Sequence, residues 1–126
     1  MLHFHTLAAT LVSLLAPAGG RAATGRRGLK LTGLELIKAL GDTRSHEDEV
    51  IVPLFANDQD MDRLAKEAEQ RLGEVPAGTT CVGLLLRGHG LYVWGTGAVV
   101  ALRHAEAFDF LFQCVTQRPE LATPWE

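Results

Sequence analysis

The apolar residues of this chain fall into two patterns. Continuous apolar runs typical of strands cover Val50–Phe55, Thr80–Leu86 and Leu91–Trp94. Helical spacing of apolar residues predicts two helices. One follows Asn57 or Asp58 and runs to about Leu72, and the other covers about Ala98–Gln117. This order of strands and helices predicts an α/β domain in which helices pack over a sheet.

Each of the two amphipathic helices has a definable apolar face. Asn57 or Asp58 is expected to cap the first helix. The apolar face of that helix consists of Met61, Leu64, Ala65, Ala68 and Leu72. The wider stripe of the second helix consists of Val99, Leu102, Ala105, Phe108, Leu111, Phe112 and Val115.

Two of the predicted strands carry a hint of their place in the sheet. The run Thr80–Leu86 is apolar on both faces, which is typical of a central strand. Pro53 lies inside the run Val50–Phe55 and lacks an N–H group, so it favours an edge strand or the end of a strand.

The first 41 residues contain shorter segments. We expect a strand at His3 and His5, then a buried helix over Thr6–Leu15. A flexible connection over Gly19–Gly28 follows. A short helix from about Gly33 to Leu40 is expected to end at Gly41, which suits a helix C-terminus.

The apolar run Leu7–Ala16 also resembles the core of a secretory signal. However, Met1–Thr6 contains no lysine or arginine, and the run is too short to span a bilayer. We therefore expect a cytoplasmic protein without a membrane partner. Cys81 and Cys114 form no recognisable motif and are expected to be reduced cysteines.

Length and charge narrow the function. A chain of 126 residues is one domain at most, and a net charge of −3 without a basic stripe argues against nucleic acid as the partner. The local excess of positive charge consists of Arg21, Arg26, Arg27 and Lys30. A solvated loop is the expected setting, and binding of an anionic substrate is the alternative.

The strongest chemical signal is a set of histidines. His89 lies between two glycines in the turn Arg87–Gly90, which follows an apolar strand, and such a side chain is accessible to a ligand. His3 and His5 point to the same face if their segment is a strand. Taken singly, the turn and the histidine pair have simpler explanations. Together they match a tri-histidine site with an open fourth position, as in catalytic zinc centres.

The other two histidines fit a metal site less well. His46 lies in the polar stretch Asp42–Glu49 and is expected to be a solvated loop residue. His104 lies among helix-forming residues and is expected to pack against the core or to cap a helix rather than bind metal.

Several of these segments carry a family resemblance. The matching stretches are His3–Thr6, Leu34–Lys38, Val52–Asp60, Leu86–Gly95 and Glu106–Phe112. With them the chain resembles the class II aldolase and adducin-like family from His3 to about Cys114. Within that family, the proline-centred segment and the RGHG turn with its following aromatic residues are most similar to the dehydratases of methionine salvage.

The resemblance implies a fold, a site and a reaction. The fold is the three-layer α/β class II aldolase fold, a mostly antiparallel sheet flanked by helices, with residues 1–126 as its C-terminal portion. His3, His5 and His89 would bind Zn²⁺, and Glu35 would be the catalytic acid/base. The reaction would be dehydration of a methylthio-substituted ketose phosphate, and the resemblance implies a cytoplasmic homo-oligomer, a tetramer.

Two other functions remain open. A sugar-phosphate aldolase would use the same metal site but break a carbon–carbon bond. A non-catalytic, adducin-like binding protein would need no metal. Metal content separates the binding protein from the two enzymes, and a substrate panel separates the enzymes from each other.

The chain also departs from the family. Phe4 stands where a small polar residue is usual, and Leu7 stands where a serine or proline region follows. Family members carry a segment before the first histidine that supplies strands and phosphate-binding loops. We therefore expect an N-terminally truncated chain that binds zinc weakly and is inactive alone, because His3 and His5 lie at a chain end that frays.

Overall fold

The protein is described by a computed structural model that covers residues 1–15 and 27–126. Within these ranges, six strands form one mixed sheet in the order β1-β5-β4-β3-β2-β6. The strands are β1 (Leu2–Phe4), β2 (Gly28–Leu31), β3 (Val50–Phe55), β4 (Gly83–Leu86), β5 (Gly90–Val93) and β6 (Ala122–Trp125). The helices are α1 (Leu7–Leu14), α2 (Met61–Leu72) and α3 (Ala98–Gln117), with 3₁₀ turns η1 (Glu35–Ala39) and η2 (Pro119–Leu121).

One pair of parallel strands, β3 and β4, determines which loops lie close together. β3 and β4 are parallel, with Phe55 opposite Leu86, and the other neighbouring strands pair antiparallel. The carboxyl ends of β3 and β4 therefore lie at the same edge of the sheet. Residues that follow these two strands are brought together there.

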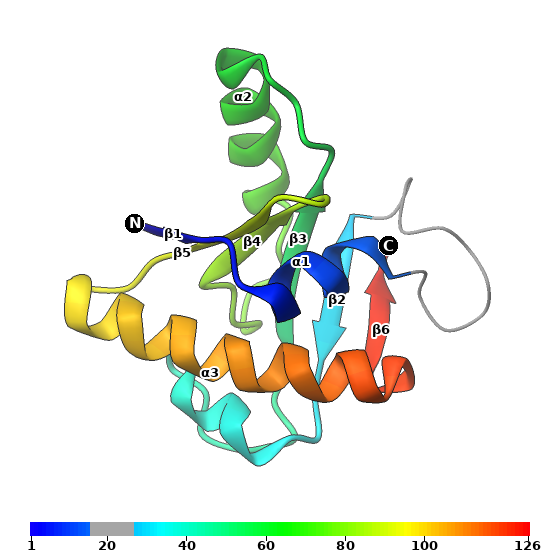
Figure 1. The fold of residues 1–126 in the computed structure, drawn as a ribbon. Coiled ribbons are helices and arrows are strands. Elements are labelled where there is room, and N and C mark those ends of the chain that lie inside the picture. The colour runs from blue at the N-terminus through cyan, green and yellow to red at the C-terminus, as the bar shows by residue number, and fades with distance from the viewer. Residues whose placement is uncertain (16–26) are drawn as a thin grey trace.

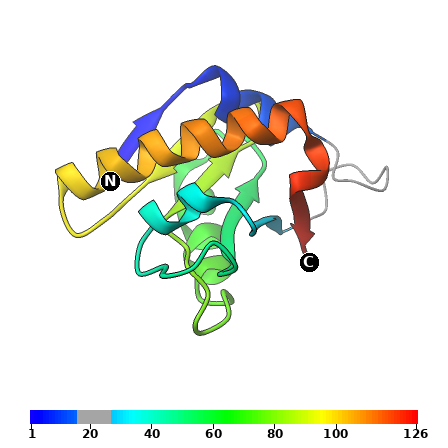
Figure 2. The ribbon, with the colours of Figure 1, turned by 90° about the horizontal axis from the view of Figure 1, so that it is seen from below.

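The two faces of the sheet are covered by different helices. Leu85 belongs to the main core, in which α1 and α3 pack side by side over one face (Figure 2). Leu84 and Leu86 point to the opposite face, where they pack with Leu64 and Ala68 of α2. Figure 1 shows α3 running across the strands and α2 standing at one end of the sheet.

The structure confirms the mixed α/β class and the predicted helix over Ala98–Gln117. Only part of its predicted stripe is core, since Val99 is 84% exposed and Leu102 is 46% exposed. Farther along α3, Phe108 and Leu111 are fully buried. Among the described residues, no helix has the length and apolar character that crossing a membrane requires.

The prediction for Pro53 is wrong. β3 lies between β2 and β4 and is not an edge strand. Ile51 donates its N–H to the carbonyl of Thr80 on the β4 side, and because this direction alternates along a strand, position 53 faces the same side. On that side, Cys81 and Val82 belong to no strand, so β4 begins at Gly83, later than predicted. Pro53 therefore has no neighbouring strand residue that would need its missing N–H group.

The predicted cap of α2 is also wrong. Asp60 is the N-cap, and its carboxylate accepts the N–H of Arg63 at 3.1 Å. Asp58 instead forms an ion pair with the Arg63 side chain. Competing acidic residues within three positions make the exact cap unreadable from the pattern alone.

Other segments near the ends of the sheet differ from the prediction. Most of the predicted connection Gly19–Gly28 lies outside the described residues, as do Arg21 and Arg26. Arg27 lies just before β2 with its guanidinium over the Trp125 ring, and Lys30 lies within β2 rather than in a loop. β2 and β6 were missed because polar residues or proline interrupt them, Lys30 in β2 and Thr123 and Pro124 in β6, so neither is a continuous apolar run.

His104 is a structural residue, as its helical setting predicts. It is 2% exposed, its Nδ1–H donates to the carbonyl of Trp94 at 2.7 Å, and its Nε2 accepts the N–H of Gly41 at 3.0 Å. The imidazole thus joins α3 to the loop after η1 and to the end of β5.

The variant His104→Leu is expected to lower the free energy of unfolding by about 2–4 kcal/mol, because it leaves two backbone groups without partners. Chemical denaturation measures this loss. The exposed His46 provides a control, since His46→Leu should change stability by no more than about 0.5 kcal/mol. Equal effects of the two variants would contradict a structural role for His104.

Candidate metal centre

The site forms where β1 lies against β5. His3 is opposite Tyr92 and Phe4 is opposite Leu91 in this antiparallel pair. Gly90 permits the close approach, because a Cβ at that position would overlap the carbonyl oxygen of Phe4. Any side chain at position 90 would push β1 away from the turn that carries His89.

The turn between β4 and β5 presents His89. Gly88 has a φ of 67°, a left-handed conformation that glycine adopts readily. Its N–H donates to the hydroxyl of Ser13 at 2.8 Å, so a fully buried side chain of α1 holds the turn. The N–H of His89 donates to the carbonyl of Leu86 at 3.0 Å and closes the turn.

The three imidazoles converge as predicted. Nε2 of His3 lies 2.7 Å from Nε2 of His5 and 3.3 Å from Nε2 of His89. One ring nitrogen from each residue lies within 4.8 Å of the other two. His3 and His5 are exposed and His89 is half-buried, so the cluster is open to solvent on one side.

Two of the rings have a defined tautomer. Nδ1 of His3 lies 3.0 Å from the carbonyl oxygen of Leu91, and Nδ1 of His89 lies 3.0 Å from Oδ1 of Asn57. Both acceptors are oxygens, so each Nδ1 carries a proton, and the lone pair of the neutral ring is on Nε2. These lone pairs face each other, and a shared cation would relieve their repulsion.

The surroundings keep His3 neutral. Burial lowers its pKa from the ordinary value, and the neighbouring His5 and His89 lower it further, against the opposing effect of the Leu91 carbonyl. Tyr92 stacks on the His3 ring with centroids 4.0 Å apart and holds its plane. A set of three imidazoles suits a transition-metal ion such as Zn²⁺ and leaves a coordination position for a substrate oxygen.

Glu35 lies away from this cluster within one chain. It begins η1, which follows β2, and Leu31 at the end of β2 pairs with Val50 at the start of β3. The histidines lie near the other end of β3, and a strand of six residues is roughly 17 Å long. Figure 1 shows η1, in cyan, at the far side of α3 from α2.

The Glu35 carboxylate is exposed and pairs with Lys38 at 2.6 Å. The hydrogen bond and charge of Lys38 lower the pKa of Glu35, which favours its ionised form. His46 is exposed as predicted. Both cysteines are free thiols, and burial raises the pKa of Cys81 to about 11.

Asn57 is a residue of the site that the sequence predicts only as a possible helix cap. It follows β3 by two residues, and His89 follows β4 by three. The parallel pairing of these strands is the signal that places both at one sheet edge. That pairing is not readable from the apolar pattern alone.

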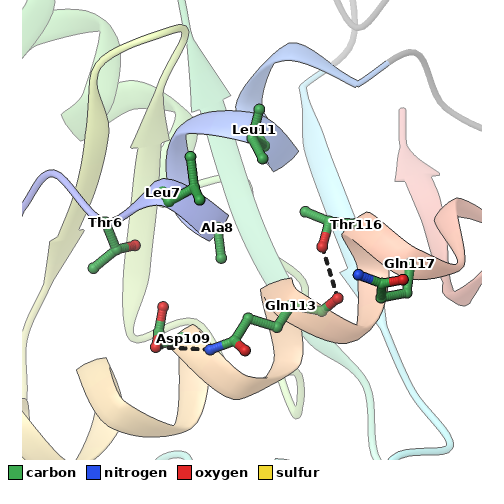
Figure 3. A pocket seen from close by; sticks show the side chains of 8 residues that line it. All are labelled: Thr6, Leu7, Ala8, Leu11, Asp109, Gln113, Thr116 and Gln117. Carbon is green, nitrogen blue, oxygen red and sulfur yellow. Dashed lines mark hydrogen bonds between the residues drawn. The ribbon is translucent and has the colours of Figure 1, made fainter.

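Two grooves lie near the histidine cluster. One, of about 580 Å³, lies between α1 and α3 (Figure 3). Its polar wall includes Asp109, whose carboxylate accepts a hydrogen bond from Gln113, and no histidine of the cluster lines it. The other, of about 440 Å³, lies between α2 and the sheet and includes Tyr92, which stacks on His3.

Comparisons with known proteins point to one family. The family model described as "Class II Aldolase and Adducin N-terminal domain" matches residues 1–116. A methylthioribulose-1-phosphate dehydratase of Marinobacter nauticus is 44% identical over 114 residues, which is 90% of this chain and 50% of that protein. Proteins with the same name from Parvibaculum lavamentivorans and Serratia proteamaculans are 43% and 41% identical over 86% and 94% of this chain.

The matches cover most of this chain but only part of each relative. The chain spans about half the length of the curated relatives it matches, 48% and 52% for the Parvibaculum and Serratia proteins. All three histidines of the cluster lie within the residues that the family model covers.

Proposed function

Because the chain belongs to the class II aldolase and adducin family, we propose that it is the C-terminal portion of a zinc-dependent hydro-lyase that acts on 5-methylthioribulose 1-phosphate. The observation that carries the proposal is the convergence of His3, His5 and His89. The complete protein would have the three-layer fold of the family, act in the cytoplasm as part of methionine salvage and release a diketo phosphate.

The three histidines would hold the metal through Nε2. The hydrogen bonds at Nδ1 of His3 and His89 favour the tautomer whose lone pair is on Nε2, the atom that would bind the metal. When bound, Zn²⁺ polarises the ketose carbonyl and acidifies the adjoining carbon. The open side of the cluster admits the substrate, because His3 and His5 are exposed.

Glu35 would move the protons. Its carboxylate takes a proton from the carbon next to the carbonyl and returns it to the departing hydroxyl, so one water leaves and the carboxylate is regenerated. The lowered pKa of Glu35 keeps it in the ionised form that begins this cycle.

The distance between Glu35 and the histidines requires that two copies of the chain share each active site. Since Glu35 and the histidines lie near opposite ends of β3, Glu35 would serve the metal site of a neighbouring copy. This arrangement needs a homo-oligomer, and a tetramer is the state we propose. Each copy would then supply three histidines to one site and a carboxylate to another.

A fusion experiment tests the proposal. The segment of the Marinobacter nauticus relative that precedes the matched region is joined to this chain, and both the extended and the 126-residue proteins are assayed. We expect the extended protein to convert 5-methylthioribulose 1-phosphate to a diketo phosphate and the short one to show weak zinc binding and no turnover.

Other outcomes favour the rival functions. Cleavage of a carbon–carbon bond in phosphorylated ketoses by the extended protein would identify an aldolase. An extended protein that folds but takes up no zinc would identify a non-catalytic binding protein. Tight zinc and full activity in the 126-residue protein would contradict the proposed incompleteness.

A further inference from the structure

We propose that Asn57 is a positioning residue of the metal centre, which fixes the tautomer and direction of His89. The inference rests on the metal site proposed above. Oδ1 of Asn57 lies 3.0 Å from Nδ1 of His89, and Nε2 of the same ring faces Nε2 of His3. Accepting the Nδ1 proton leaves Nε2 as the metal donor.

A second amide sets the direction of the Asn57 side chain. Nε2 of Gln59 donates to Oδ1 of Asn57 at 3.3 Å. Oδ1 therefore accepts from both neighbours, and the opposite orientation would bring the two amide nitrogens together. With the oxygen facing His89, the Nδ1 atom of that ring must be the donor.

The loop that carries Asn57 is held by charged contacts. The Asp58 carboxylate pairs with the Arg63 guanidinium through distances of 2.5 and 2.8 Å, and it also accepts the N–H of Asp60 at 2.9 Å. The hydrogen bond from Arg63 is the main cause that lowers the pKa of Asp58 to about 2, so the Asp58 carboxylate is ionised at neutral pH. Asn57 is thus presented on an anchored loop.

The three histidines are oriented in different ways. The carbonyl of Leu91 holds His3, and within the described residues the ring of His5 contacts only the other two histidines. Tyr92 stacks on the ring of His3, but Asn57 accepts a ring proton, so substitution of Asn57 can test the tautomer of His89. A carboxylate at position 57 could accept the same proton, whereas a methyl group could not.

The test compares Asn57→Ala with Asn57→Asp by zinc titration against a chromogenic chelator. We expect Asn57→Ala to weaken zinc binding by about 10- to 100-fold, the usual effect of losing such a partner, and Asn57→Asp to stay near the wild-type affinity or exceed it. Gln113→Ala is the control, because it removes an amide that donates to Asp109, away from the histidines, and should leave affinity unchanged.

A second measurement follows the ring itself. Nitrogen NMR of the metal-free protein should show the Nδ1–H tautomer of His89 in the wild type and in Asn57→Asp, and a mixture of tautomers in Asn57→Ala. A purely structural role would lower thermal stability without changing this distribution.

The proposal is overturned if Asn57→Ala binds zinc like the wild type, if Asn57→Asp is as weak as Asn57→Ala, or if the wild type binds no zinc. None of these readouts uses a substrate. An extended protein that shows the expected zinc pattern but does not dehydrate the ketose phosphate would overturn the proposed function alone.

Discussion

Replacing His89 with alanine is expected to weaken zinc binding by roughly 100- to 1,000-fold. Structural zinc sites with four ligands bind with about 10–16 kcal/mol, so one ligand of three accounts for several kcal/mol. In the extended protein the same change should abolish turnover. Zinc content after dialysis and chelator competition measure the first effect, and the dehydratase assay measures the second.

His46→Ala is the matched control for His89→Ala. His46 is an exposed histidine outside the cluster, so its loss should leave zinc content and turnover unchanged. Equal zinc content in wild type and His89→Ala would contradict the assignment of His89 as a ligand.

Glu35→Gln is expected to lower turnover of the extended protein by about two to four orders of magnitude with unchanged zinc content, because it removes a positioned proton-transfer group but no ligand. Steady-state kinetics and metal analysis test both halves of this expectation. Lys38→Met is a useful companion, since it removes the ion pair of Glu35 but keeps the carboxylate. Near-normal activity of Glu35→Gln would make Glu35 an ordinary surface residue.

Mixing two inactive variants tests the proposed sharing of sites. If Glu35 serves a neighbouring copy, unfolding and refolding Glu35→Gln together with His89→Ala should restore part of the activity. Some mixed sites then combine intact histidines from one chain with an intact Glu35 from another. No recovery from oligomers shown to be mixed would place the acid/base within the same chain as its metal.

The apolar pattern predicted an element correctly where the segment was long enough, or apolar enough, to show a helical or strand pattern. α3 matches its predicted bounds because 20 residues give more than five helical turns of pattern. β4 and β5 were found because they lie in continuous apolar runs, whereas Lys30 interrupts β2 and Thr123 and Pro124 interrupt β6. The position of Pro53 in a central strand depends on a break in β4, which is a tertiary feature.

The convergence of the three histidines was predictable because local patterns determine its parts. His3 lies in β1 and His5 directly follows that strand with its ring beside that of His3, and the glycines beside His89 are needed by the backbone of the turn and by β1. Asn57 was not predictable as a partner of His89, because its place depends on the parallel pairing of β3 and β4.

The most direct test of the proposed metal centre is zinc-edge X-ray absorption on the protein with one equivalent of zinc, at a concentration that fills the site. We expect three imidazole nitrogens and one oxygen at about 2.0–2.1 Å, with one nitrogen lost in His89→Ala. Sulfur scattering from Cys81 or Cys114, or a spectrum unchanged by His89→Ala, would contradict a site formed by His3, His5 and His89.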